Sequence, residues 1–311
     1  METNIKELDD LFYEFIRTKG QSTSQMYVRD VERFISFLEV NQNMSLVCIN
    51  SFKEIKRIHI LKYLDYLENN PNLLKRNYAN NSINRKISAI SSFFHFLCQK
   101  EILESNPAQL VSRKKSILIR ETQALTDKEV KYLFDLVLEK GTILHKAIIF
   151  TLFTTGIRQA ELRNIEISDI KSIDGISILS IIAKGQSQHQ IPLHPTTAYY
   201  LRTLLESYED TDNKNSDWVF RASIGRKISK NKLSSTAVNY IVKKYARVIS
   251  PKKNITPHSA RATLISSLLD NGTDIFKVSQ IVNHKDVRTT QNYNKRRINI
   301  KNNPIFTLNF F

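Results

Sequence analysis

The stretch "ITPHSARATLISSLLDNG", residues 255–272, decides the fold of the second half of the chain. Pro257 suits the first turn of a helix and Gly272 suits its end, so the stretch predicts one helix between them. The apolar side chains at helical spacing, which we expect to face a core, are Leu264, Leu268 and Leu269. His258 and Arg261 stand three residues apart near the start, on neighbouring positions of one helix face. Their His-x-x-Arg spacing is by itself a weak functional signal.

The polar run "VNHKDVRTTQNYNK", residues 282–295, follows that helix. His284 ends a helix expected over residues 274–283, where a histidine is often only a favourable partner of the helix dipole. Tyr293 has almost no apolar neighbours in the sequence, whereas a structural tyrosine normally lies on an apolar face with its hydroxyl bonded. Tyr293 is therefore either a surface residue or a reactive one.

Two further motifs lie upstream. In "TTGIRQAELRN", residues 154–164, Arg158 follows a glycine turn and begins a helix, where it is either a surface arginine or a guanidinium that binds a phosphate. Glu161 lies on the same helix face and is expected to hold Arg158 in place. "GISILSIIAKGQSQHQIPLHP", residues 175–195, contains two β-rich runs and predicts a hairpin. Lys184 lies at its tip, as an ordinary exposed lysine or as a mobile proton donor.

The remaining sequence predicts two domains and a mainly α-helical fold. Residues 1–112 form a helical domain, residues 113–121 a basic linker, and residues 122–311 a mostly helical domain with a small antiparallel sheet. The apolar stripes of the first domain are Met26, Val31, Phe34, Ile35 and Leu38; Ile55, Ile58, Leu61 and Leu64; and Ile83, Ile87, Ile90, Phe94 and Leu97. Thr126 and Glu129 form a predicted capping box, and Gly141 ends the helix that follows it.

The charge points to a polyanionic partner. The net charge is +16, with +1 in residues 1–112, +3 in residues 113–121 and +12 in residues 122–311. A positive field of this size favours nucleic acid. Cys48 and Cys98 lie far apart, which argues against a disulfide framework and a zinc site and fits a reducing cytoplasm. We expect neither a signal peptide nor a membrane span.

The two arginines, two histidines, lysine and tyrosine described above are together the groups that cleavage of a phosphodiester bond without a metal requires. Arginines stabilise the charge that builds on the non-bridging oxygens as phosphorus becomes five-coordinate. A histidine can take the phenol proton, because the unperturbed pKa of tyrosine is about 10. A lysine can protonate the departing 5′-oxygen, and the phenolate can be the covalent nucleophile.

The chain resembles the tyrosine recombinase (phage integrase) family in the order and spacing of four motifs. These are "TGIRQAEL", "IIAKGQSQHQIPL", "HSAR" and "NHKDVRTTQNY". The first domain is similar to that family's SAM-like core-binding domain, notably in "TSQMYVRDVERFISFLE" and "SINRKISAISSFFHFLCQKEILESNPA". The compact length is similar to the Xer group. Two departures are Val282-Asn283, where the family usually has Leu-Gly, and Ala260, where it commonly has leucine.

The resemblance implies a role for each reactive residue. Arg158 and Arg261 would hold the scissile phosphate, and Glu161 would support them. Lys184 would be the general acid and His258 the acid/base partner. His284 would be a further hydrogen-bond donor and Tyr293 the nucleophile. Neither a metal nor another cofactor is implied.

The resemblance also implies the partners. The chain would act on double-stranded DNA with a specific recombination site, as a homotetramer on two duplexes, with a paralogous recombinase or an accessory protein as a further possible partner. It would form a 3′-phosphotyrosyl bond and a Holliday junction in a bacterial or mobile-element setting, in the cytoplasm at the nucleoid. Expected DNA-binding residues are Arg29, Arg85, Lys86, Arg113, Lys114 and Lys115. The apolar tail, about residues 296–311, is expected to contact a neighbouring subunit.

Two other functions remain open from the sequence. One is a type IB topoisomerase, which uses similar chemistry but rejoins the same strand. The helical first domain and the apolar tail argue against it. The other is a DNA-binding relative that has lost catalysis, and the presence of all six reactive groups argues against that.

Overall fold

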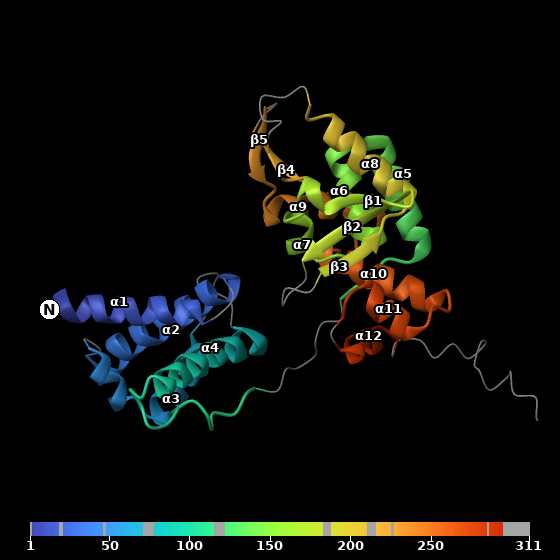
Figure 1. The fold of residues 1–311 in the computed structure, drawn as a ribbon. Coiled ribbons are helices and arrows are strands. Elements are labelled where there is room, and N and C mark those ends of the chain that lie inside the picture. Colours follow the sequence, from blue (N-terminus) through green and yellow to red (C-terminus); the bar gives the residue numbers. More distant parts are fainter. Residues whose placement is uncertain are drawn as a thin grey trace, which may run out of the picture. The chain divides into compact units, whose positions relative to one another are not determined.

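The computed structural model describes residues 2–18, 21–45, 48–70, 78–114, 122–182, 188–209, 216–224, 227–284 and 286–294. The chain forms two compact units, Met1–Arg120 and Glu121–Phe311, and each has its own core (Figure 1). Both are predominantly helical, and the second contains small antiparallel sheets. The predicted mainly α-helical class with a small antiparallel sheet is therefore confirmed.

The first unit is a helical bundle. Its elements are α1 (Glu2–Arg17), α2 (Gln21–Gln42), the 3₁₀ helix η1 (Ile49–Glu54), α3 (Arg57–Asn69) and α4 (Asn80–Gln99). Helix α2 packs against α1, α3 and α4. Phe93 lies at the centre of the core, with its ring centroid 5.2 Å from that of Phe15 and 5.5 Å from that of Phe52, both in edge-to-face contact. Such aromatic pairs add to the stabilisation that burial of their surface provides.

The stripe predicted for α4 is confirmed, because all five of its apolar residues are buried. The stripe predicted for α2 is confirmed except at Met26, which is exposed. The stripe predicted for α3 is confirmed at Ile55 and Leu64, which are buried, but is wrong at Ile58 and Leu61, which are 51% and 38% exposed. The buried face of α3 consists of Ile60, Tyr63, Leu64 and Leu67. Ile55 lies at the end of η1, and the chain is extended at Lys56 before α3 begins, so helical spacing counted from Ile55 does not continue into α3.

The second unit is built around one apolar helix. Its helices are α5 (Asp127–Lys140), α6 (Ile143–Thr155), α7 (Gln159–Arg163), η2 (Ile167–Asp169), α8 (Pro195–Glu206), α9 (Ser235–Ile249), α10 (Pro257–Asp270), α11 (Ile275–Ile281) and α12 (Val287–Asn294). Helix α6 contacts α5, α7, α8, α9 and α10, and most of its residues are buried. A helix that is apolar on all sides needs such neighbours.

The predicted helix ends are present in the second unit. The backbone N–H of Thr126 donates to Oε2 of Glu129 at 2.7 Å, and the N–H of Glu129 donates back to Oγ1 of Thr126 at 3.3 Å. Gly141 ends α5, and its N–H donates to the carbonyl of Val137. Pro257 occupies the first turn of α10, as expected.

A three-stranded antiparallel sheet lies in the second unit in the order β1 (Ile170–Ile173), β2 (Ile176–Ile182), β3 (Gln188–Pro192). β2 and β3 confirm the two predicted runs and pair in the register Ser180 with Gln190. Residues 183–187, including the predicted tip, lie outside the described residues. The sequence did not predict the second hairpin, which β4 (Arg221–Ile224) forms with β5 (Lys227–Lys232). The lysine-rich sequence of β5, "KISKNK", lacks the alternation of apolar and polar residues that indicates a strand.

Across the described ranges, no helix is both long and apolar enough to span a bilayer.

A buried ion group joins α2 to α4 in the first unit. Asp30 and Lys86 are each 1% exposed, and the Lys86 ammonium donates to Asp30 Oδ1 at 3.0 Å. Arg85, which is partly exposed, forms an ion pair with the other oxygen of Asp30. Burial lowers the pKa of Lys86, and the bond and charge of Asp30 oppose that change. The buried ammonium of Lys86 is therefore stabilised only while the carboxylate of Asp30 is present.

We expect Asp30→Ala to reduce the free energy of unfolding by about 3 kcal/mol or more, because it leaves a buried ammonium without its carboxylate partner. Urea denaturation measures this loss. The double variant Asp30→Leu, Lys86→Met removes both charges and should lose less. Arg29→Ala, an exposed change on the same helix, is the control and should stay within about 0.5 kcal/mol of the parent. Equal losses in the single and double variants would contradict the assignment.

Candidate active site

Arg158 is positioned by the turn between α6 and α7. Gly156 ends α6 in the left-handed region, with φ of 64°, and a Cβ there would lie 2.9 Å from Leu264 of α10. The backbone N–H of Arg158 donates to Glu161 Oε2 at 2.7 Å, and its Nη1 donates to Oε1 at 2.8 Å. Glu161 is largely covered, whereas the Arg158 side chain is 45% exposed. Glu161 therefore anchors one edge of the guanidinium and leaves the rest accessible to an anion.

Helix α7 is tied to the segment that leads into α9. The side-chain amide of Gln159 donates to the carbonyl of Ser235 at 2.6 Å, and Arg163 Nε donates to the carbonyl of Leu233 at 2.6 Å. Each of these hydrogen bonds joins residues about 70 positions apart, and no local sequence motif predicts them. They fix the short helix that carries Arg158.

Arg261 is buried on α10, with 2% of its surface exposed. Nη1 donates to the carbonyl of Gly156 at 2.9 Å, Nη2 donates to the carbonyl of Val282, and Nε donates to His284 Nε2 at 3.4 Å. Burial, and then the charge of Arg158, lower its pKa to about 10, so it remains charged at neutral pH. None of these three acceptors carries a charge. The positive charge of Arg261 is thus held in place without being neutralised by them.

The turn before His284 depends on Asn283, which has φ of 50°. This is the left-handed region, which glycine adopts most easily and asparagine better than most other residues. The family that the chain resembles usually has glycine here, and asparagine is compatible with the same left-handed conformation. The backbone N–H of His284 then donates to the carbonyl of Ser279 at 2.9 Å. The departure from Leu-Gly is therefore conservative in its backbone geometry.

The two histidines lie in the field of the arginines. Burial, followed by the charges of Arg261, Arg158 and His258, lowers the pKa of His284 to about 4. Burial, followed by the charges of Arg261 and Arg158, also lowers the pKa of His258, which lies at the surface in the first turn of α10. Both imidazoles are therefore neutral near pH 7 and have a lone pair that can accept a proton or a hydrogen bond.

The surroundings of Tyr293 are less polar than its neighbours in the sequence suggested. It is partly buried and packs against the small cluster of Ile265, Val278 and Val282 that joins α10 and α11. The expectation that it has almost no apolar company is therefore wrong, because the neighbours come from other helices. Its phenol lies close enough to Arg261 to act on the pKa of that guanidinium. The tyrosine thus faces both an apolar cluster and the buried arginine.

The structure brings together five of the six predicted reactive residues. The shared contacts and pKa effects link Arg158, His258, Arg261, His284 and Tyr293. Lys184 lies outside the described residues, as do Lys115 and residues 295–311 of the tail. Among the described side chains, no group of three or more His, Cys, Asp or Glu residues is placed to hold a metal ion.

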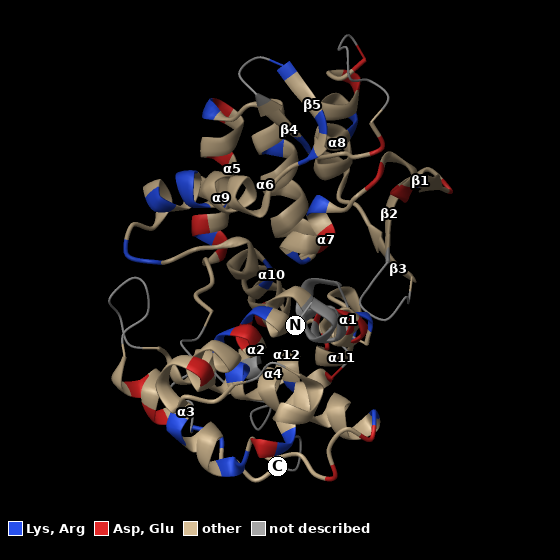
Figure 2. Cartoon of the chain, turned by 90° about the vertical axis from the view of Figure 1, so that its left-hand side faces the viewer, with Lys and Arg blue, Asp and Glu red and all other residues tan. Residues whose placement is uncertain are grey.

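The expected DNA-binding residues of the first unit differ in accessibility. Arg29 and Arg113 are exposed. Lys114 forms an ion pair with Glu68 at 2.5 Å. Arg85 is partly exposed, and buried Lys86 instead bonds Asp30, so Lys86 is an internal group in this structure rather than an accessible cation. Helix α2 carries acidic residues among its arginines, whereas α4 carries Arg85 and Lys86 and no acidic residue (Figure 2).

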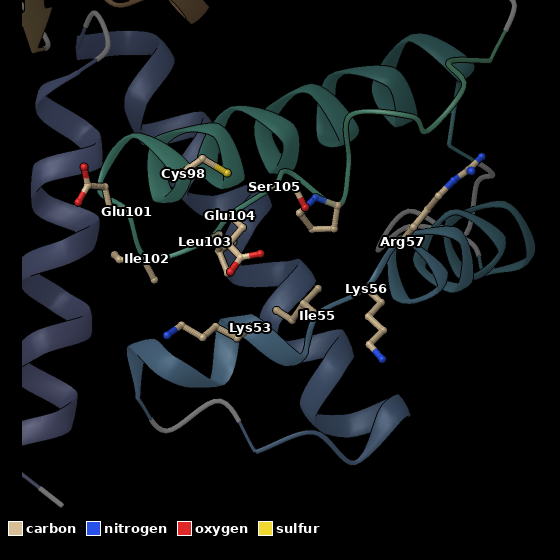
Figure 3. Close-up of a pocket in the computed structure, with 11 residues that line it drawn as sticks. Lys53, Ile55, Lys56, Arg57, Cys98, Glu101, Ile102, Leu103, Glu104 and Ser105 are labelled. Atoms are coloured by element: carbon tan, nitrogen blue, oxygen red, sulfur yellow. The ribbon is translucent and has the colours of Figure 1, made fainter.

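Two further surface features were not expected from the sequence. A small hollow of about 200 Å³ at the end of α9 is lined by Lys243, Arg247, Lys252 and Lys253, a dense set of cations. A larger cavity of about 800 Å³ lies in the first unit, between η1 with the start of α3 and the end of α4 (Figure 3). Its lining mixes basic residues such as Lys56 with Glu101 and Glu104, which does not favour a polyanion. It belongs to a different unit from the reactive residues.

The low pKa of His284 predicts a pH dependence of stability. Between pH 6.5 and about pH 4 the unfolded chain binds a proton at this histidine and the folded chain does not. Stability should therefore fall as pH decreases through this window. After allowance for partial exposure, we expect a loss of roughly 1 kcal/mol from His284 between pH 7 and about pH 5. His284→Gln should lose less over the same interval in urea denaturation, and an identical pH slope in both proteins would contradict the assignment.

Both units match known protein-family models. The model of the phage integrase family matches residues 123–299, more than half of the 311-residue chain, and the model of the phage integrase N-terminal SAM-like domain matches residues 10–101. Tyrosine recombinase XerC of Pediococcus pentosaceus is 26% identical over 302 residues, covering 92% of each chain. Tyrosine recombinase XerD of Oceanobacillus iheyensis is 25% identical over 289 residues, covering 91% of each.

Solved structures share the fold. The XerH site-specific recombinase bound to difH substrate gives a TM-score of 0.64 at 16% identity, over 89% of this chain and 77% of that one. A lambda integrase(75–356) dimer bound to a COC′ core site gives 0.61 at 17% identity, over 90% and 96%. The chain therefore belongs to the phage integrase family of tyrosine recombinases and is Xer-like in its length and layout.

Proposed function

We propose that this chain is a site-specific recombinase that cleaves and rejoins DNA through Tyr293. The observation that carries the proposal is the buried guanidinium of Arg261, whose three hydrogen-bond acceptors are uncharged, with Arg158, two neutral histidines and a phenol around it. A fixed cation in a partly desolvated place is suited to a phosphate whose negative charge grows during reaction. The phenol supplies a nucleophile beside it.

In the cleavage step, the Tyr293 oxygen attacks phosphorus and the bond from phosphorus to the 5′-oxygen breaks. Arg261 and Arg158 stabilise the non-bridging oxygens of the five-coordinate transition state. Arg261 is held by backbone carbonyls, so it needs little reorganisation when charge develops. Glu161 keeps Arg158 in position. The products are a 3′-phosphotyrosyl bond and a strand with a 5′-hydroxyl.

Two protons have to move. His258 can accept the phenol proton, because burial and the two arginines lower its pKa and so keep the imidazole unprotonated. Lys184 gives a proton to the departing 5′-oxygen, and His284 donates a hydrogen bond to the phosphate. Rejoining reverses the steps, with the 5′-hydroxyl of a partner duplex as the attacking group. Because the phosphotyrosyl bond retains the energy of the broken bond, the exchange needs no ATP.

The partner is double-stranded DNA with a specific recombination site. The net charge of +16 supports this, as do the related XerH and lambda integrase proteins, whose solved structures contain DNA. Exposed Arg29 and Arg113 and the basic hollow at the end of α9 are candidate phosphate contacts. Binding through phosphates weakens as salt rises, because the contacts release counterions. We expect the protein to act in the cytoplasm, at the nucleoid.

We also propose that the chain assembles as a tetramer on two duplexes, alone or with a paralogous recombinase, and passes through a Holliday junction. The tail, residues 296–311, ends in Ile305, Phe306, Leu308, Phe310 and Phe311. A mainly apolar groove of about 460 Å³, lined by Val130, Phe134, Leu138, Phe150 and Phe153, lies along α5 and α6 of the second unit. An apolar tail from another copy is a suitable occupant of such a groove.

Neither alternative function is favoured. The named relatives are recombinases, and their likeness extends over both units rather than over the catalytic unit alone. A type IB topoisomerase would relax any supercoiled plasmid without a particular site. A catalytically inactive relative would have no need for a phenol, two neutral histidines and two arginines in one place.

Trapping on a nicked suicide duplex tests the proposed chemistry. The wild-type chain should form a covalent protein–DNA adduct, and Tyr293→Phe should form none, because the nucleophilic oxygen is missing. Tyr199→Phe removes the hydroxyl of an exposed tyrosine on α8 and should leave the yield unchanged. Adducts in Tyr293→Phe, or none in the wild-type chain on a duplex recovered from its own DNA targets, would reject the proposal.

The arginine variants refine that experiment. We expect Arg158→Ala and Arg261→Ala each to lower the cleavage rate by at least about 100-fold, the usual cost of removing a donor to a transition-state oxyanion. DNA affinity should be largely retained. If either variant loses all binding while it stays folded, its arginine is a binding or structural residue.

Deletion of residues 303–311 tests the tail. We expect the shortened chain to bind one duplex but to lose higher-order assembly in sedimentation on DNA, because its apolar anchor is gone. Leu138→Asp, which places a carboxylate at the edge of the groove, should give the same defect with the tail present. Lys140→Asp, an exposed change at the end of the same helix, is the control. Unchanged assembly after the deletion would reject the tail contact.

A further inference from the structure

Thr290 is the unusual residue of α12. The helix has the polar sequence "VRTTQNYN", yet Thr290 is completely buried, whereas its neighbour Thr289 is exposed. The Oγ1 atom of Thr290 lies 2.7 Å from Nδ1 of His284. A buried hydroxyl needs a hydrogen-bond partner, and here the partner is a histidine of the proposed active site.

We propose that Thr290 is a positioning residue: its hydroxyl fixes the ring orientation and tautomer of His284, and it ties the helix that carries Tyr293 to the phosphate-binding pocket. The proposal deepens the proposed function, because it assigns a role within the same site. It concerns a side chain that none of the proposed chemical steps uses directly.

The tautomer follows from the two neighbours of His284. Arg261 has only donors, and its Nε donates to His284 Nε2 at 3.4 Å. A neutral imidazole has one donor and one acceptor, so an Nε2 that accepts requires hydrogen on Nδ1. Nδ1–H then donates to Thr290 Oγ1, which accepts. The free protein therefore holds His284 with its proton on the side away from Arg261.

A hydroxyl suits this position better than a carboxylate, because it can both accept and donate. When a phosphate takes the hydrogen bond that Nε of Arg261 donates, Nε2 of His284 is released. The Thr290 hydroxyl can then turn and donate to Nδ1, and Nε2–H can point to the phosphate. The ring loses one proton at Nδ1 and gains one at Nε2 through water, with no change in its charge. His284 thereby becomes a neutral donor.

The bond also links two parts of the site. Thr290 and Tyr293 stand three residues apart on α12 and so lie on neighbouring positions of one face. Tyr293 packs on the apolar cluster of α10 and α11, and Thr290 bonds His284, just beyond α11. The apolar packing of Tyr293 and the hydrogen bond of Thr290 therefore together fix the rotation of α12 about its own axis. Loss of the hydroxyl would loosen the placement of the nucleophile as well as that of the histidine.

Three variants test the proposal on the nicked suicide duplex. Thr290→Val keeps the shape and removes the hydroxyl, and it should lower the single-turnover cleavage rate about tenfold, the effect of one lost hydrogen bond. Thr290→Ser restores the hydroxyl and should cleave within about twofold of the wild-type chain. Thr289→Val, the matched control on the exposed side, should cleave at the wild-type rate. Thr290→Val should also change the pH profile of cleavage, which a purely structural defect would not do.

Nitrogen NMR of the histidine-labelled free protein gives a second measurement that needs no activity. The wild-type chain should show His284 with hydrogen on Nδ1, and Thr290→Val should show a mixture of tautomers or a shifted pKa. Hydrogen on Nε2 in the free wild-type chain would overturn the proposal, as would an unchanged cleavage rate and pH profile in Thr290→Val. If the wild-type chain has the expected tautomer but forms no adduct, the proposed function fails and the histidine assignment stands.

Discussion

The geometry of the site depends on the guanidinium of Arg261. Its donors join α10 to two other segments: the turn after α6 through Gly156, and the short stretch after α11 through Val282 and His284. Because an arginine has several donors in a fixed plane, one side chain can hold all three. A lysine, with a single ammonium on a flexible stem, could not reproduce this arrangement. The same group is therefore both the internal brace of the pocket and its principal positive charge.

Those features of the fold and the site that depend on nearby residues could be predicted from the sequence. The capping box of Thr126 and Glu129, the position of Arg158 at the start of a helix, and the apolar face of α4 all follow from residues a few positions apart. Helix caps and amphipathic faces are set by neighbours along the chain, so their patterns are visible in the sequence. The grouping of the reactive residues followed from resemblance, since spacing alone was weak at each motif.

What the sequence did not provide depends on contacts between distant segments. The face of α3 was misjudged because η1 interrupts the helical spacing, and β4–β5 was missed because its residues are mostly polar. Lys86 looked like a surface cation, yet Asp30, 56 residues earlier, makes its burial possible. The apolar surroundings of Tyr293 come from α10 and α11, and the partner of Thr290 lies in the preceding loop. A one-dimensional pattern contains none of these pairings.

The attachment of α7 has a consequence for the orientation of Arg158. A five-residue helix has too few internal bonds to hold its own position, so its place is set by Gln159 and Arg163, which bond the backbone at Ser235 and Leu233. Any displacement of the start of α9 is therefore passed through these two hydrogen bonds to the helix that begins at Arg158. The orientation of Arg158 thus depends on a segment that is distant in sequence and that carries none of the candidate reactive residues.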